Sequence, residues 1–227
     1  MQFHPTEEKA GPFSGLGIVL SNLFAIGLAL WQDWDLRPML VIYWAQSVII
    51  GCFHFVRIIR LRQFSTKGFT SNGERVPETA KGKWSTALFF AVHYGFFHLV
   101  YLVYLVFAMA SGRFDGFSSG NGWDPAKGDL IWILSAILGF LAGHGFSFRQ
   151  NVAADLRRRP NLGVMMFLPY ARVVPMHLTI IFGAGMASNR LAVLLFSVLK
   201  TGADWLMHVV EHKVLQKSPR VSDSRHS

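Results

Sequence analysis

The sequence contains a single cysteine, Cys52, among 227 residues. One thiol excludes an internal disulfide and any zinc or iron–sulfur site that requires several cysteines. Charged residues are also scarce: they make up 15% of the chain, whereas a soluble domain carries roughly 25%. Hydrophobic residues make up 52%. The shortage of charge predicts a membrane protein. The polar N-terminus, MQFHPTEEKAG, lacks the basic region of a cleaved signal peptide, so we expect the apolar segment after it to be retained.

Six stretches of the chain are long and apolar enough to cross a bilayer, which takes about 20 helical residues. They are residues 12–31, 38–59, 84–110, 130–148, 171–187 and 191–212. We therefore predict an all-α integral membrane protein. Its one domain, residues 12–213, would be a bundle of about six transmembrane helices. Residues 1–11 would form a cytoplasmic N-terminal segment, and residues 214–227 a basic, disordered tail.

Basic residues accumulate in alternate connections, and this predicts the orientation of the bundle. Residues 57–83 carry seven Lys and Arg, residues 149–159 carry four, and the C-terminal tail is also basic, whereas the opposite connections hold few. The positive-inside rule then places both termini in the cytoplasm of a multi-pass inner-membrane protein. The same distribution explains the net charge of +9 without nucleic acid. The connection around residues 61–83, rich in Gly, Ser and Thr, is expected to be mobile.

Histidines are concentrated in these segments. Seven lie within or at the ends of the predicted helices: His54, His93, His98, His144, His177, His208 and His212. The depth of each histidine can be estimated at about 1.5 Å per residue from the basic residue that marks the cytoplasmic end of its helix. For His177, that marker is Arg172. Most then fall in the cytoplasmic half of the membrane, although neighbouring helices run in opposite directions. A shared depth favours a shared site.

The strongest motif is ADWLMHVVEHK, residues 203–213. Offsets of four and seven place Asp204, His208 and Glu211 on one helix face, and His212 is again four residues from His208. The pattern is similar to the Glu-x-x-His pairs of helical di-metal sites. Imidazole and carboxylate ligands suit zinc or non-haem iron. The predicted metal ligands, for one ion or two, are His93, His144, His177, Asp204, His208, Glu211 and His212.

Less specific interpretations compete with this one. Glu211 could pair with Lys213 or a basic loop, and His212 could be a solvated helix end. His54 could be an interfacial histidine, and His98 a core histidine or a donor to a metal ligand. Lys200 lies four residues before Asp204, and an ion pair within the helix is favoured for it over a lysine that moves protons or holds an anion.

Three elements, HYGFFH, PYARVVPMHLTIIFGAG and LKTGADWLMHVVEH, resemble the bacterial family of six-span membrane proteins of unknown function, DUF6498. The resemblance covers most of the chain. It implies an integral membrane fold and no established activity, so the predicted site depends on the residues themselves.

The leading functional hypothesis is a membrane-embedded, metal-dependent enzyme that acts on a lipid or another amphiphile. A zinc enzyme would be a hydrolase that activates water with Glu211 or Asp204 as general base, and an iron enzyme would be an oxidoreductase. The first alternative is an electron-transfer protein with b-type haem, or one linked to quinone. The second is a transporter of metal ions or protons.

Overall fold

The computed structural model describes residues 23, 26, 27, 30, 31, 36–110, 129–175, 177, 178 and 189–210. Its elements, in chain order, are α2 (Leu36–Arg60), β1 (Thr70–Ser71), β2 (Glu74–Arg75), α3 (Ala80–Ala110), α4 (Asp129–Arg157), α5 (Leu162–Phe167), the 3₁₀ helix η2 (Leu168–Arg172) and α7 (Asn189–Val210). The protein is mostly helical, as predicted, and the two strands form one short antiparallel hairpin.

The helices follow the apolar segments of the sequence. α2, α3 and α7 closely match the predicted spans 38–59, 84–110 and 191–212, whereas α4 continues beyond its predicted end at residue 148 to Arg157. Residues Arg37–Arg60 and Ala80–Phe107 are long and apolar enough to cross a membrane, judged by length and composition. The predicted spans 12–31 and 171–187 lie largely outside the described residues, as do the N-terminal segment and the C-terminal tail.

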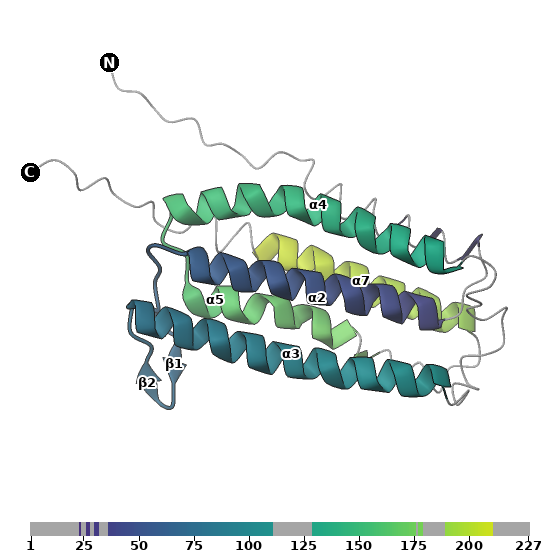
Figure 1. Ribbon diagram of the computed structural model, residues 1–227, viewed down its shortest axis with the longest axis horizontal. Coiled ribbons are helices and arrows are strands. Elements are labelled where there is room, and N and C mark those ends of the chain that lie inside the picture. Colours follow the sequence, from purple (N-terminus) through teal and green to yellow (C-terminus); the bar gives the residue numbers. More distant parts are fainter. Residues whose placement is uncertain are drawn as a thin grey trace, which may run out of the picture.

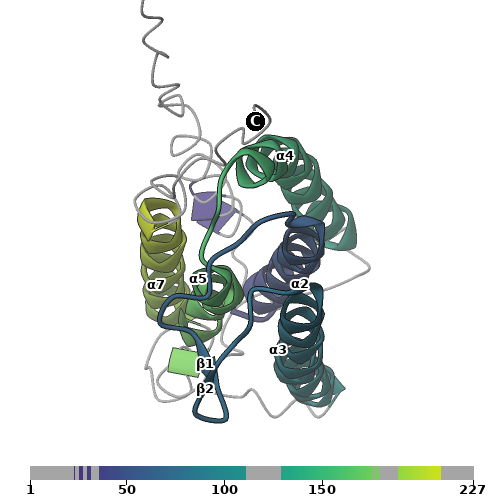
Figure 2. The same cartoon turned by 90° about the vertical axis from the view of Figure 1, so that its left-hand side faces the viewer.

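α2 is the central helix of the bundle. It packs against α3 on one side and α4 on the other, and α5 lies between α2 and α7 (Figures 1 and 2). The contact between α2 and α3 is close at Gly51, where the ring of Tyr94 occupies the space that a side chain would need. The hydroxyl of Tyr94 hydrogen-bonds to the Ser47 hydroxyl at 2.9 Å. A glycine and a buried hydrogen bond thus fix the spacing of these two helices.

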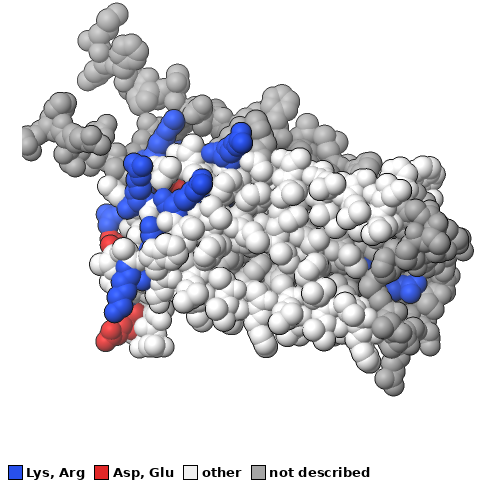
Figure 3. Space-filling view, in the orientation of Figure 1, with Lys and Arg blue, Asp and Glu red and all other residues white. Residues whose placement is uncertain are grey.

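Much of the surface is apolar. Only 28% of the apolar stretch of α3 is buried inside the protein. Its exposed large hydrophobic side chains include Leu88, Phe89, Val92, Phe96, Leu99, Val103, Val106 and Phe107. Lys and Arg gather instead at one end of the bundle, and a long white surface separates them from the small blue area at the other end (Figure 3). We call the first end, where α2 and α4 finish and α3 and α5 begin, the basic end. So many exposed large hydrophobic side chains on one helix are unusual for the surface of a soluble monomer.

The connection between α2 and α3 was expected to be mobile, and the structure shows that this expectation was wrong. Ser65 pairs with Asn161 in a parallel bridge, donating its N–H to the carbonyl of Pro160 at 2.9 Å. The Glu78 carboxylate accepts the backbone N–H of Thr66 at 3.0 Å and forms an ion pair with Arg159. The connection is therefore tied to the segment between α4 and α5 by contacts that its Gly- and Ser-rich composition does not reveal.

Because Glu78 can be protonated, the stability of this connection depends on pH. Its hydrogen bond from the Thr66 backbone, assisted by Arg159 and Arg75, holds the pKa of the Glu78 carboxyl below its usual value. A lowered pKa means that the carboxylate stabilises the connection above about pH 4.3, and that this contribution is lost as the pH falls through the folded pKa.

We expect amides of residues 64–79 to exchange hydrogen faster below that pH, after correction for intrinsic exchange rates. The Glu78→Gln variant should exchange fast already at neutral pH and show no step. An identical pH profile in the variant and the wild type would contradict this role of Glu78.

Candidate functional site

Three charged side chains meet in the apolar interior of the bundle. Arg172 ends η2, and Lys200 and Asp204 lie one turn apart on α7. Their exposed fractions are only 4%, 5% and 3%. Lys200 lies near the middle of α7, roughly 15 Å from either end at 1.5 Å per residue. We call these three residues the charged cluster.

Asp204 is the centre of the charged cluster. Its Oδ2 accepts a hydrogen bond from Lys200 Nζ at 3.1 Å, and its Oδ1 forms an ion pair with Arg172 Nη2. The predicted ion pair between Lys200 and Asp204 is therefore confirmed. The contact with Arg172 adds a second cation, from a part of the chain about thirty residues earlier in the sequence. One carboxylate thus joins α7 to η2 through its ion pair with Arg172, while its hydrogen bond from Lys200 lies within α7.

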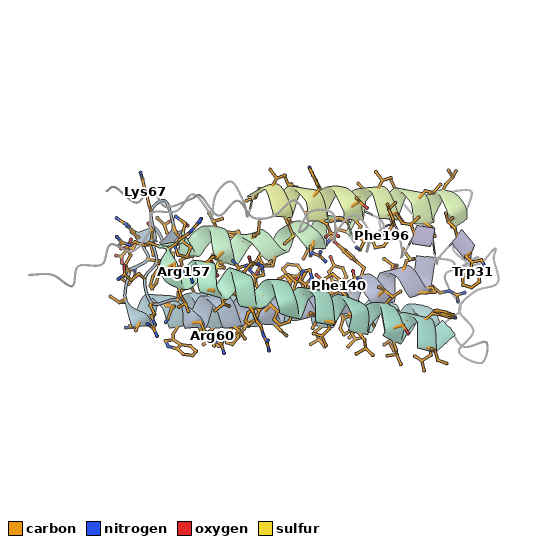
Figure 4. The ribbon with its side chains drawn as sticks, turned by 90° about the horizontal axis from the view of Figure 1, so that it is seen from above. Trp31, Arg60, Lys67, Phe140, Arg157 and Phe196 are labelled. Atoms are coloured by element: carbon orange, nitrogen blue, oxygen red, sulfur yellow. The ribbon has the colours of Figure 1, made fainter. Side chains whose placement is uncertain are left out.

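Aromatic rings enclose the charged cluster. The guanidinium of Arg172 lies 5.7 Å from the ring centre of Tyr43 on α2 and 5.6 Å from that of Phe140 on α4. Lys200 Nζ lies 5.4 Å from the same Tyr43 ring. Phe196 meets Tyr43 edge to face, and the labelled Phe140 and Phe196 lie on α4 and α7, well away from the basic end (Figure 4). Cation–π contacts of this kind are strongest where the cation has lost its water.

Local structure explains why Arg172 points inward. The α5 helix begins with Asn161, whose side chain accepts the Val164 N–H at 3.1 Å. Pro169, in the first turn of η2, removes a backbone donor, and the helix tightens to 3₁₀ geometry there. The carbonyl of Arg172 then accepts a hydrogen bond from the buried Tyr43 hydroxyl at 2.9 Å. That bond anchors the backbone beside α2 and directs the side chain toward α7.

The described residues of the cluster bring two cationic side chains to one carboxylate. Two nitrogens of Arg172, Nε and Nη1, are buried without a hydrogen-bond partner in this part of the chain. Buried donors that lack partners cost free energy, and charges more so. The arrangement is therefore suited to receive an acceptor that carries negative charge.

Asp204 is the one predicted metal ligand that the charged cluster contains. Of the others, His93 Nδ1 hydrogen-bonds to the Tyr170 hydroxyl at 2.8 Å, the ring of His144 stacks on Phe140, and His177 hydrogen-bonds to Tyr101. The α7 helix includes His208, but the side chain of His208 and all of Glu211 and His212 lie outside the described residues.

Within the described residues, no three His, Cys, Asp or Glu side chains are close enough together to hold a metal ion. His93, His144, His177 and Asp204 therefore do not form a ligand group among themselves. Whether they share a metal with His208, Glu211 and His212 stays a prediction. A metal ion would have to compete for the Asp204 carboxylate with the two cationic side chains that already contact it.

The structure corrects the use of Arg172 as a marker of a helix end. Arg172 is buried in the charged cluster, so the depth assigned to His177 from it was wrong. Sequence reasoning missed Arg172 and Tyr43 as site residues. The signal that could have found Arg172 is the unusual PYARVVP context, in which a lone arginine stands between apolar residues beside two prolines.

Two further histidines were left open by the sequence. His98 is buried: its Nδ1 hydrogen-bonds to the Tyr94 carbonyl at 2.8 Å, and its own carbonyl accepts the indole N–H of Trp44 at 2.8 Å. These contacts fit the core interpretation of His98. His54 is also buried, one turn before Arg57, which pairs with Asp155 at 2.8 Å. Its interfacial interpretation, which concerns depth in the membrane, stays a prediction.

Comparison with known proteins assigns the chain to a family. Residues 5–221 match the model of a family of unknown function, DUF6498, and the chain belongs to it. The match confirms the resemblance seen in the sequence. No curated protein matches the chain, and neither does any solved structure.

Proposed function

We propose that this chain is a multi-pass protein of the inner membrane, a bundle of about six transmembrane helices with both termini in the cytoplasm. The apolar surface of α3 supports a lipid environment. The clustering of Lys and Arg at the basic end supports the orientation, since the basic end of a membrane protein faces the cytoplasm.

Reporter fusions test the orientation. A fusion at Thr70, in the connection at the basic end, is expected to report a cytoplasmic location. A fusion at Asn121, between α3 and α4, is expected to report a periplasmic one. The charge asymmetry is the reason for both expectations. A cytoplasmic signal at Asn121 would contradict the proposed topology.

We further propose that the charged cluster is the functional centre and that it binds an anion with carboxylate- or phosphate-like oxygens. The observation that carries this proposal is the pair of buried donors on Arg172, Nε and Nη1, which lack a hydrogen-bond partner among the described residues. A planar guanidinium recognises such oxygens in a two-pronged geometry. A bound anion would satisfy both donors.

The position of the cluster favours transport as the activity. Transporters hold their substrates near the middle of the bilayer, where interrupted helices meet. Lys200 lies near the middle of α7, and Arg172 is the last residue of the 3₁₀ helix η2, which follows α5 directly. The function that this geometry supports best is therefore the transport of a small anion.

Thermal unfolding of the purified protein in a neutral detergent tests the binding step. Phosphate, sulfate, acetate and chloride are compared at equal ionic strength. One preferred anion is expected to raise the Tm, by an amount that grows with its concentration. Lys200→Met removes one cation of the cluster and should abolish the response, whereas Lys200→Arg should keep it.

The exposed Arg60 provides a matched control, since Arg60→Gln removes one cation outside the cluster. Its anion response should equal that of the wild type. A Tm that is independent of the anion, or equal responses in Lys200→Met and Arg60→Gln, would overturn the proposal. Uptake of the preferred anion into proteoliposomes then tests transport.

A metal site at the end of α7 is a second proposal. The observation that favours it is the continuous helix through Val210, which keeps Asp204 and His208 one turn apart. Zinc or iron bound there would serve a hydrolase or an oxidoreductase acting on an amphiphile, as the sequence predicts. Elemental analysis of the purified protein, with an absorption spectrum that also detects haem, tests it. A preparation that neither contains nor takes up a stoichiometric metal would exclude it.

A further inference from the structure

An open groove of about 450 Å³ lies close to the basic end of the bundle. The α2–α3 connection, the α5–η2 segment and the end of α7 form its walls, with Lys67, Phe69, Gly163, Phe167, Ala171 and Val210 among the lining residues. In the view along the bundle, α5 and α7 lie beside each other with the hairpin next to them (Figure 2). The groove is separate from the charged cluster, and no residue of the cluster lines it.

The walls of the groove are apolar. Phe167 is 60% exposed, and its ring meets Phe69 edge to face at 6.3 Å. Gly163 lies under the ring of Phe69 and leaves no room there for a side chain. The two aromatic rings thus form a fixed apolar wall that a hydrocarbon chain can contact.

One basic residue, Lys67, lies at the rim of the groove, and its backbone is held in place. Asn161 Nδ2 donates to the Lys67 carbonyl at 2.9 Å, and the Lys67 N–H donates to Ser65 Oγ at 3.2 Å. Gly68 follows with a φ of 72°, a left-handed conformation that favours glycine and turns the chain between Lys67 and Phe69. The exposed Lys67 is therefore presented at the rim by a defined turn, at the same end of the molecule as Arg157 and Arg60 (Figure 4).

We propose that this groove binds one anionic phospholipid, with its headgroup at Lys67 and an acyl chain along Phe69, Phe167 and Val210. Charge complementarity selects this occupant, since Lys67 places a cation at the rim, among the basic residues of this end, where a membrane presents anionic headgroups. The combination of an apolar wall and a cation at the rim matches an anionic amphiphile better than a zwitterionic lipid or a free anion. The inference rests on the membrane location proposed above, but not on the anion site.

Lipid binding to the purified full-length protein in neutral detergent tests this inference. Native mass spectrometry compares phosphatidylglycerol and phosphatidylcholine with identical acyl chains. We expect phosphatidylglycerol to bind more tightly, and Lys67→Gln to weaken that binding by about fivefold without affecting phosphatidylcholine. Lys81→Gln, which removes an exposed lysine of the same end outside the groove, should change neither lipid.

A second variant tests the apolar wall. Phe167→Ser should weaken the binding of both lipids, because it removes the exposed ring that contacts the chain, and it leaves the buried core unchanged. Inorganic phosphate should not compete with phosphatidylglycerol. Equal affinity for the two lipids, equal effects of Lys67→Gln and Lys81→Gln, or full competition by phosphate would overturn the proposal. Reporter fusions test the membrane location separately, so the two failures can be told apart.

Discussion

Asp204→Asn is expected to be the most destabilising single substitution in the charged cluster. It leaves Arg172 and Lys200 buried together without the carboxylate that now compensates them. Breaking a buried ion pair by removing one partner costs about 3–5 kcal/mol. The variant should therefore accumulate poorly in membranes, and its free energy of unfolding in mixed micelles should fall by about that amount.

Lys200→Met is the matched comparison. It removes a cation and leaves Arg172 paired with Asp204. We expect this variant to be clearly more stable than Asp204→Asn, although it loses the hydrogen bond between Lys200 and Asp204. If Lys200→Met proves equally or more destabilising, charge balance is not what holds the cluster together. Adding the preferred anion should stabilise the wild type and leave Lys200→Met unchanged.

The comparison also separates the two functional proposals. If Asp204 serves chiefly as a metal ligand, Asp204→Asn should lose metal while the protein still inserts and folds. If Asp204 serves chiefly to compensate the charges of Arg172 and Lys200, the variant should lose unfolding free energy whether or not metal is present. Metal content and unfolding free energy, measured on the same preparations, distinguish these outcomes.

The sequence predicts those structural features that depend on interactions between residues close together in the chain. The apolar length of each segment was enough to predict α2, α3 and α7, because a helix closes its hydrogen bonds within its own segment. The spacing of Lys200 and Asp204 was enough to predict their ion pair, because residues four apart lie on one helix face. Both predictions use only local information.

Contacts between distant segments were not predictable in this way. Arg172 belongs to the cluster because Tyr43 anchors its backbone, a contact across 129 positions that no local pattern reveals. The α2–α3 connection is ordered because Asn161 and Arg159 hold it from the far end of α4, although its own composition resembles a mobile loop. The metal ligands predicted from their shared depth do not form a group of three among the described residues. Side chains at one depth can still lie on different sides of the bundle.

The buried ion pair between Arg57 and Asp155 is the second place where a large effect is expected. Arg57 Nε lies 2.8 Å and Nη2 3.3 Å from the two oxygens of Asp155, and the side chains are only 4% and 9% exposed. The pair joins the ends of α2 and α4 at the basic end. Asp155→Asn should lower the free energy of unfolding by about 3–5 kcal/mol, since it removes the charge that compensates a buried guanidinium.

A double-mutant cycle shows whether stability requires the ion pair itself or only that neither charge is left buried without a partner. Replacing both partners, as in Arg57→Met with Asp155→Leu, should recover most of the stability lost in either single variant, because an apolar pair of similar volume is often neutral in place of a buried ion pair. Glu78→Gln is the control at the same end, since its ion pairs with Arg75 and Arg159 are largely exposed and should contribute less than about 1 kcal/mol. Additive single effects in the cycle would contradict a direct interaction. Recovery in the double variant would instead show that α2 and α4 need matched side chains here, charged or apolar, and that the charge of Arg57 is not itself required for the fold.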